Sequence, residues 1–155
     1  MDEVTESTAD TKRQFLRHTI ATLAYRGGIT LSDAPEGFDQ LSIGETTRTP
    51  VEILAHINDL LDWSLRVSKG QYEWQPSTPL TWEKEMARFF AALEELDHYF
   101  ASDSPIDCQV EKIFQGPIAD ALTHVGQLAI MRRVAGSPIP RGNYFKTEIV
   151  TGRFR

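Results

Sequence analysis

The chain has 155 residues, of which 41% are hydrophobic and 25% are charged, and its formal net charge is −6 at pH 7. This length suffices for one hydrophobic core, so we expect a single domain over residues 1–155. The acidic balance and the scattered basic residues argue against nucleic acid as a partner. No apolar run approaches the roughly 18 residues of a membrane span, so we expect no membrane partner and a cytoplasmic protein.

The first third of the sequence predicts one helix followed by a long loop. The acidic, polar residues 1–10 are expected to form a flexible N-terminus. A helix is predicted from Thr11 to Tyr25, ending at Gly27-Gly28, because glycine favours the C-terminal turn of a helix. From Ile29 to Thr49, glycine, proline and aspartate recur too often for a regular element, so this segment is predicted to be a loop.

A second helix is predicted to begin at Thr49-Pro50, where a capping hydroxyl precedes proline at the first helical position, and to end near Lys69-Gly70. Its inner face repeats at intervals of three and four residues, the spacing of helices that pack nearly antiparallel. That face consists of Ile53, His56, Leu60, Trp63 and Val67. One polar residue, His56, therefore occupies a predicted core position.

A third helix is predicted to begin at Thr81 and has the same spacing without a polar member, so we expect it to be purely structural. Its face consists of Trp82, Met86, Phe89, Leu93, Leu96 and Phe100. A fourth helix is predicted from Gly116-Pro117 to Ala135-Gly136, after a short helical segment from Gln109 to Phe114. One of its faces is apolar, and the neighbouring face begins with three polar residues, which are Asp120, His124 and Gln127.

Three polar side chains thus lie at positions where a helical bundle has its core, namely His56, Asp120 and His124. A buried carboxylate costs several kcal/mol unless it is paired or bound to a metal. Two imidazoles and one carboxylate form a 2-His-1-carboxylate set, which binds a divalent metal and leaves coordination positions open. We predict such a site. The alternatives are a hydrogen-bonded core histidine at His56 and an Asp120–His124 charged pair on a partly wet face.

Two segments of the chain resemble the DinB/YfiT-like metalloenzyme family. The second helix of that family is similar to TPVEILAHINDLLDWSL, and its last helix and tail are similar to GPIADALTHVGQLAIMRRVAGSPIPRGNYFKTEIVTGR. The specific part of the resemblance is His56 combined with the run from His124 to Leu128. The usual metal set of the family is three histidines, and here Asp120 stands in place of the second one. An aspartate makes the set more anionic and harder, or marks a site that has been weakened or lost.

The resemblance implies an all-α, DinB/YfiT-like up-down-down-up four-helix bundle, which in the family is often a homodimer. It implies a divalent metal, which is zinc, iron, manganese or nickel. It further implies transfer of a low-molecular-weight thiol, such as bacillithiol, mycothiol or glutathione, to an electrophilic small-molecule substrate through a metal-bound thiolate. Two alternatives stay open: a hydrolase in which the metal activates water, and a non-catalytic metal-binding or interaction bundle.

Under the thiol-transferase interpretation, three further residues are candidates for the site. Gln127 lies one helical turn beyond His124 and is a candidate catalytic donor to a bound water or substrate, or a structural partner of the neighbouring helix. Arg132 and Arg133 are candidate cofactor-binding residues for the carboxylate of a thiol, although the helix dipole favours cations there in any case. The C-terminal tail, residues 138–155, is expected to pack on or near the site or to form a dimer contact.

Overall fold

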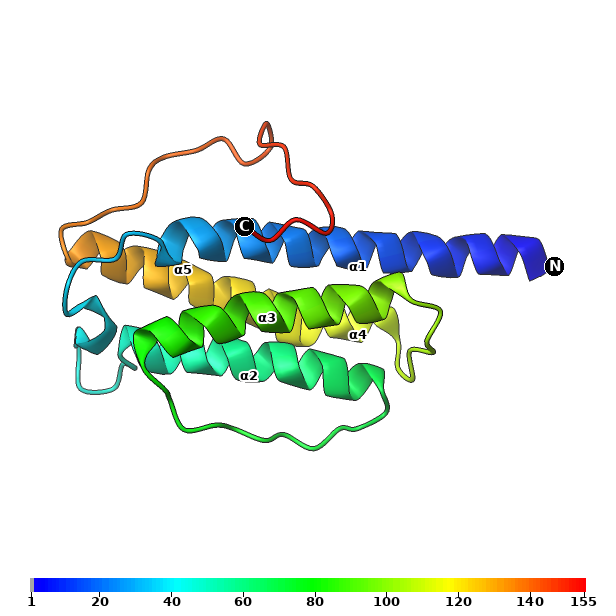
Figure 1. The fold of residues 1–155 in the computed structure, drawn as a ribbon, viewed down its shortest axis with the longest axis horizontal. Helices are drawn as coiled ribbons and strands as arrows, with labels where there is room; N and C mark the ends of the chain where they lie inside the picture. The colour runs from blue at the N-terminus through cyan, green and yellow to red at the C-terminus, as the bar shows by residue number, and fades with distance from the viewer. Residues whose placement is uncertain (1) are drawn as a thin grey trace.

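The computed structural model describes residues 2–155, with side chains from Thr8 onward, and its regular secondary structure is entirely helical. The elements are α1 (Asp2–Leu31), the 3-10 helix η1 (Phe38–Gln40), α2 (Pro50–Ser68), α3 (Trp82–Ala101), α4 (Val110–Ile113), the π-helical turn η2 (Phe114–Ile118) and α5 (Ala119–Val134). The long helices lie side by side as a bundle, so the predicted all-α class is confirmed (Figure 1). None of the described helices has the length and apolar character that crossing a membrane requires.

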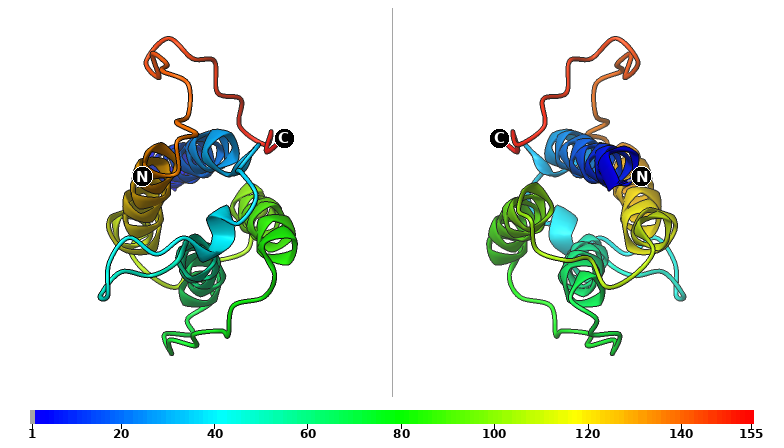
Figure 2. Two further views of the ribbon diagram at one scale, coloured as in Figure 1. Left: turned by 90° about the vertical axis from the view of Figure 1, so that its left-hand side faces the viewer. Right: turned by 90° about the vertical axis from the view of Figure 1, so that its right-hand side faces the viewer.

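Each long helix packs against two others. α2 lies between α3 and α5, and α1 packs against the same two helices on the other side of the bundle (Figure 2). The core between them is built from aliphatic side chains and phenylalanines. Its fully buried members include Leu16, Ile20, Leu23, Leu54, Ile57, Leu61, Phe89, Leu93, Leu96 and Phe100. The predicted apolar face of the third helix is therefore confirmed over its last four positions.

The predicted ends of α2 are confirmed. Both ends could be predicted because each is determined by residues that are close to it in the sequence. At the start, the Glu52 carboxylate accepts the backbone N–H of Thr49 at 2.7 Å, which completes a capping box. At the end, Gly70 has φ of 79°. Its N–H donates to the carbonyl of Val67, and the next N–H donates to that of Arg66. This is the glycine-terminated turn expected at a helix C-terminus.

The predicted ends of the first helix were wrong, because α1 runs from Asp2 to Leu31. Residues 2–10, predicted to be a flexible N-terminus, are helical, and Met1 lies outside the described residues. Gly27 does not end the helix. A Cβ added there would lie 2.4 Å from Cζ of Phe89 on α3. Glycine at this position allows the phenylalanine ring to lie directly against the backbone of α1, which is a packing requirement rather than a stop signal.

The connection between α2 and α3 is held against α2 by a buried polar network. Asp59 of α2 accepts both the backbone N–H and the hydroxyl of Ser77, at 3.0 and 2.7 Å. Arg88 of α3 donates to Asp59 at 2.7 Å, and Glu85 accepts the backbone N–H of Leu80 at 3.0 Å. Asp59 and Glu85 are both buried. Because these bonds compensate the cost of burying the carboxylates, the irregular connection has a defined course along α2.

The C-terminal tail, which was expected to pack on or near the candidate site or to form a dimer contact, packs on α1. The guanidinium of Arg26 lies 3.6 Å from the centre of the Tyr144 ring, and Tyr25 meets the same ring edge-on at 6.4 Å. Arg155 lies over Phe90 of α3 at 5.1 Å. Figure 2 places the tail beyond α1, on the opposite side from α2. The physical reason is that the outer face of α1 offers aromatic and cationic partners for the tail.

The contact between Gly27 and Phe89 predicts opposite effects for two adjacent glycines. Gly27→Ala should destabilise the protein by about 1–3 kcal/mol, because the new methyl overlaps a core ring. Gly28→Ala is the matched control, since the nearest atom to its added Cβ is 3.9 Å away. That variant should be more stable than the wild type by about 0.5–1 kcal/mol. Urea unfolding of the two variants measures the difference, and equal effects would contradict the packing role of Gly27.

Candidate metal centre

His56, Asp120 and His124 lie together between α2 and α5. Nε2 of His56 is 3.8 Å from Oδ2 of Asp120, and Nε2 of His124 is 3.3 Å from Oδ1 of the same carboxylate. The two imidazole rings are nearly perpendicular, with 4.7 Å between their centres. One donor atom from each residue lies within 4.8 Å of the other two. The three side chains, which were predicted to lie on two different helices, therefore form one cluster that could hold a metal ion.

The cluster lies at the edge of the core. Ala121, Val125 and Leu128 are buried positions in the middle of α5, so Asp120 and His124 point to the side of the contact with α2. The side chains of His56 and His124 are 20% and 12% exposed, whereas that of Asp120 is 48% exposed. The sequence therefore predicted more burial for the side chain of Asp120 than the structure shows. Its partial exposure removes most of the cost of a buried carboxylate and leaves the site open to solvent.

The donor set and its spacing fit a divalent cation. Ligand bonds of about 2.1 Å place neighbouring donors of a four-coordinate ion about 3.4 Å apart. The separation between His124 and Asp120 has this value within 0.1 Å, and that between His56 and Asp120 is wider, at 3.8 Å. These two distances involve different oxygens of the carboxylate, and the donor atoms of the three residues lie within 4.8 Å of one another, so side-chain rotations are needed to close the set around an ion. Two nitrogens and a carboxylate oxygen suit zinc, iron(II) or manganese.

Gln127 orients His124. Its Oε1 lies 2.9 Å from Nδ1 of the imidazole. When Nδ1 carries the ring proton and donates it to this oxygen, the lone pair of Nε2 is left on the side of Asp120 and His56. Metal-binding histidines are commonly fixed in this way by an acceptor on the other ring nitrogen. The structure therefore places Gln127, predicted as a catalytic donor, in contact with a candidate ligand, where it acts as a positioning residue.

The electrostatic environment favours neutral His56. Burial lowers the pKa of this imidazole, and the positive charges of Arg48 and of protonated His124 lower it further, against the opposing effect of Asp120 and Asp59. The neutral imidazole is the form that binds metals. A lowered pKa therefore means that His56 stays competent for metal binding at a more acidic pH than an ordinary histidine does.

An aromatic wall covers one side of the cluster. The ring of Trp74, from the connection between α2 and α3, meets His56 edge-on at 5.7 Å, and Trp63 packs edge-on against Trp74 at the same distance. Nε1 of Trp63 donates to the carbonyl of Tyr72, which ties the connection to α2. Sequence reasoning missed Trp74 as a site residue. The available signal was a large aromatic residue within a polar segment that has no helical spacing.

A cavity of about 680 Å³ adjoins His124 and Gln127. Ile43 and Arg48 of the loop before α2 line it, and so do Ile130 and Met131 of α5. Its volume is within the range of small-molecule sites. Sequence reasoning also missed Arg48, because the loop shows no periodic pattern that relates it to α5.

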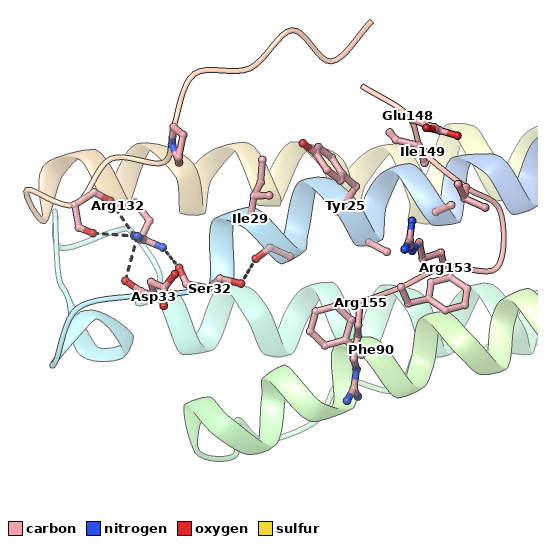
Figure 3. Close-up of a pocket in the computed structure, with 17 residues that line it drawn as sticks. Tyr25, Ile29, Ser32, Asp33, Phe90, Arg132, Glu148, Ile149, Arg153 and Arg155 are labelled. Carbon is pink, nitrogen blue, oxygen red and sulfur yellow. Dashed lines mark hydrogen bonds between the residues drawn. The ribbon is translucent and has the colours of Figure 1, made fainter. Parts of the chain in front are cut away.

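Arg132 was predicted to bind a cofactor, and in the structure its guanidinium closes the end of α1. The side chain is buried and donates to the backbone carbonyls of Thr30, Ser32 and Asp33 and to both oxygens of Ser137. Figure 3 shows the bonds to Ser32 and Asp33. These five bonds use all five N–H groups of the guanidinium. Arg133 is exposed in the last turn of α5 and does not line the cavity beside His124.

A second, larger cavity of about 780 Å³ lies between α1 and the C-terminal tail. Figure 3 shows Tyr25, Ile29, Phe90 and Arg153 around it. His56, Asp120 and His124 do not line this cavity, so it is separate from the candidate metal centre.

The contact between Gln127 and His124 predicts that Gln127→Leu weakens zinc binding by roughly 10- to 100-fold, because the imidazole loses the acceptor that fixes its ring proton. Gln127→Glu is the rescue variant, since a carboxylate accepts the same N–H and should retain or raise the affinity. Calorimetric titration with Zn²⁺ compares the three proteins. Equal affinities would show that Gln127 does not position His124.

Metal affinity should also fall as the pH is lowered, because each ligating histidine must lose its proton. The loss approaches about tenfold per pH unit for each histidine once the pH is below its pKa. Since the pKa of His56 is lowered, its contribution should begin at a pH below the ordinary histidine value. Titrations with Co²⁺ at several pH values between 7.5 and 5 measure the profile. A flat profile would contradict ligation by imidazole.

Comparison of the chain with protein-family models, with curated proteins and with solved structures finds no match. The candidate centre therefore depends on the residues and geometry of this chain alone.

Proposed function

We propose that this protein is a metal-dependent enzyme in which His56, Asp120 and His124 bind one divalent cation. The observation that carries the proposal is the convergence of their donor atoms within 4.8 Å from two different helices. A structural zinc site is closed by four protein ligands, whereas three ligands leave a position for a reacting molecule. The adjoining cavity gives a small molecule access to that side of the cluster.

We further propose that the bundle is DinB-like, with the up-down-down-up order of helix directions. The course of the chain supports this proposal, because α1 and α5 cross Figure 1 in one direction and α2 and α3 in the other. Two consecutive helices with the same direction need a long return segment. The connection between α2 and α3 supplies it, and its bonds from Ser77 to Asp59 and from Trp63 to Tyr72 hold it along α2.

The activity that we propose is transfer of a low-molecular-weight thiol to an electrophilic carbon. A bound divalent ion lowers the pKa of a thiol in an open coordination position, so that the thiolate is available near neutral pH. In the overall reaction, a carbon–sulfur bond forms, the leaving group departs with its bonding electrons, and the thiol proton is released.

The residues of this chain would hold the reactants and exclude water. Gln127 keeps His124 in the ligating tautomer, and the contact of Trp74 with His56 restricts water on one side. The cavity on the other side is then the place for the electrophile, with Ile130 and Met131 as its apolar contacts. Because Trp74 covers one side of the cluster, reactants would enter from the other side, through the cavity.

Metal content is the first test. Protein purified without an affinity tag should contain about one metal per chain by mass spectrometry, and Asp120→Ala and His124→Ala should lose it, because two donors cannot hold the ion in competition with water. His98→Ala is the matched control, since His98 is exposed on α3 and outside the cluster. Circular dichroism verifies that each variant is folded. A folded wild type that binds no added Zn²⁺, Fe²⁺ or Mn²⁺ would overturn the proposal.

The activity is tested with the metal-loaded wild type, glutathione or cysteine as the thiol, and 1-chloro-2,4-dinitrobenzene as the electrophile. Thiol-dependent release of chloride that disappears in Asp120→Ala supports thiol transfer. Metal-dependent consumption of the electrophile without any thiol would instead identify a hydrolase. Retention of full activity in Asp120→Ala would contradict a role of the cluster in either reaction.

A further inference from the structure

Arg48 is a charged residue beside the cluster that metal binding does not explain. It directly precedes Thr49, the capping residue of α2, and lines the same cavity as His124 and Gln127. Its side chain is exposed and forms no hydrogen bond or salt bridge with another described side chain. The capping box fixes the backbone of the next residue, Thr49, so the backbone of Arg48 is held beside the cavity.

A cation at this place opposes the binding of another cation. Arg48 and His124 line the same cavity, so the positive charge of Arg48 lies on the side of the cluster that faces the cavity. A positive charge there repels a divalent ion in the cluster and weakens its binding unless an anion lies between the two charges. An anionic ligand in the cavity would remove this repulsion and gain attraction from both positive centres. The arrangement therefore favours an anion in addition to the metal.

The remaining lining of the cavity gives the ligand an apolar part. Ile43 and Ile130 are large apolar side chains that are 42% and 57% exposed, and both line the cavity together with Met131. Small-molecule sites typically combine an apolar lining with a few polar groups that fix the orientation of the ligand. Here the polar side chains of the lining include Arg48, three threonines and the amide N–H₂ of Gln127, and Arg48 is the one that carries a fixed positive charge.

The acidic residues nearby limit the charge of the ligand. Glu52 lies in the first turn of α2, where its carboxylate accepts the backbone N–H of Thr49, and the carboxylate of Asp120 lies within 3.8 Å of both histidines of the cluster. These two negative charges favour a monoanion over a dianion such as phosphate. A carboxylate also matches the planar donor fork of arginine.

We propose that the cavity beside the cluster binds a small carboxylic acid with an apolar body, with its carboxylate on the side of the cavity that Arg48 and His124 line. The inference rests on the proposed function and names the substrate class of that site. Arg48 is then a specificity residue for the carboxylate, and Ile43, Ile130 and Met131 are the contacts of the apolar body.

The test compares Arg48→Gln with Arg141→Gln, a control that removes the same charge from an exposed position in the tail. Hexanoate is titrated into Zn²⁺-loaded protein by calorimetry. The affinity should fall roughly 10- to 100-fold in Arg48→Gln and stay unchanged in Arg141→Gln, because a charge-assisted bond is lost only in the first. Without hexanoate, Zn²⁺ should bind about 2- to 10-fold more tightly to Arg48→Gln, because a repulsion is removed.

The outcomes separate this inference from the proposed function. Absence of Zn²⁺ binding in the wild type is the failure of the proposed function, and it is measured before hexanoate is added. Normal Zn²⁺ binding with equal hexanoate affinity in wild type and Arg48→Gln overturns the inference alone. If inorganic phosphate binds more tightly than hexanoate, and if this affinity for phosphate is lost in Arg48→Gln, the choice of a carboxylate as the ligand is overturned. Acetate tests the contribution of the apolar body. In the wild type, acetate should bind more weakly than hexanoate. In Ile130→Ser, the two acids should bind with equal affinity, because an apolar contact of hexanoate is lost.

Discussion

The packing of α2 against α5 fixes the distance between the helices that carry His56 and the Asp120–His124 pair. Ile53 and Ile57 are buried on α2, and Val125 is buried on α5. Burying each such side chain contributes about 1.5–3 kcal/mol, so the separation of the two helices is maintained by apolar contacts and requires no ion. The donor atoms are therefore held close together before any metal binds, and little of the binding free energy is spent on ordering the chain.

Local signals predicted the ends of α2 correctly and those of α1 wrongly, and packing across the bundle was the part that they could not predict. Both ends of α2 depend on residues within a few positions, such as Glu52 and Gly70, and both were predicted from the sequence. Gly27, in contrast, is required by packing and not by a helix end. The ring that it accommodates belongs to Phe89, which is distant in the sequence, so composition alone could not distinguish a helix end from a close contact.

The candidate centre was predictable to the extent that it follows helical periodicity. His56 and His124 interrupt regular apolar spacing, and the structure places both in one cluster with Asp120. Residues on irregular segments gave no such signal. Trp74 and Arg48 reach the site from two connections whose courses depend on the whole fold. The place of Arg132 was not predictable for a related reason, because four of its five acceptors are backbone carbonyls, whose positions cannot be read from the sequence.

The loop between α1 and α2 is tied at both ends. Arg132 holds its first residues through the carbonyls of Ser32 and Asp33, and the bond from Thr49 to Glu52 fixes its last turn. A surface span with anchored ends accepts changes in sequence and length at small cost in folding free energy. Ile43 and Arg48 belong to this span. Ligand preference can therefore evolve, or be engineered, within this one loop while the helices that carry the metal-binding side chains remain unchanged.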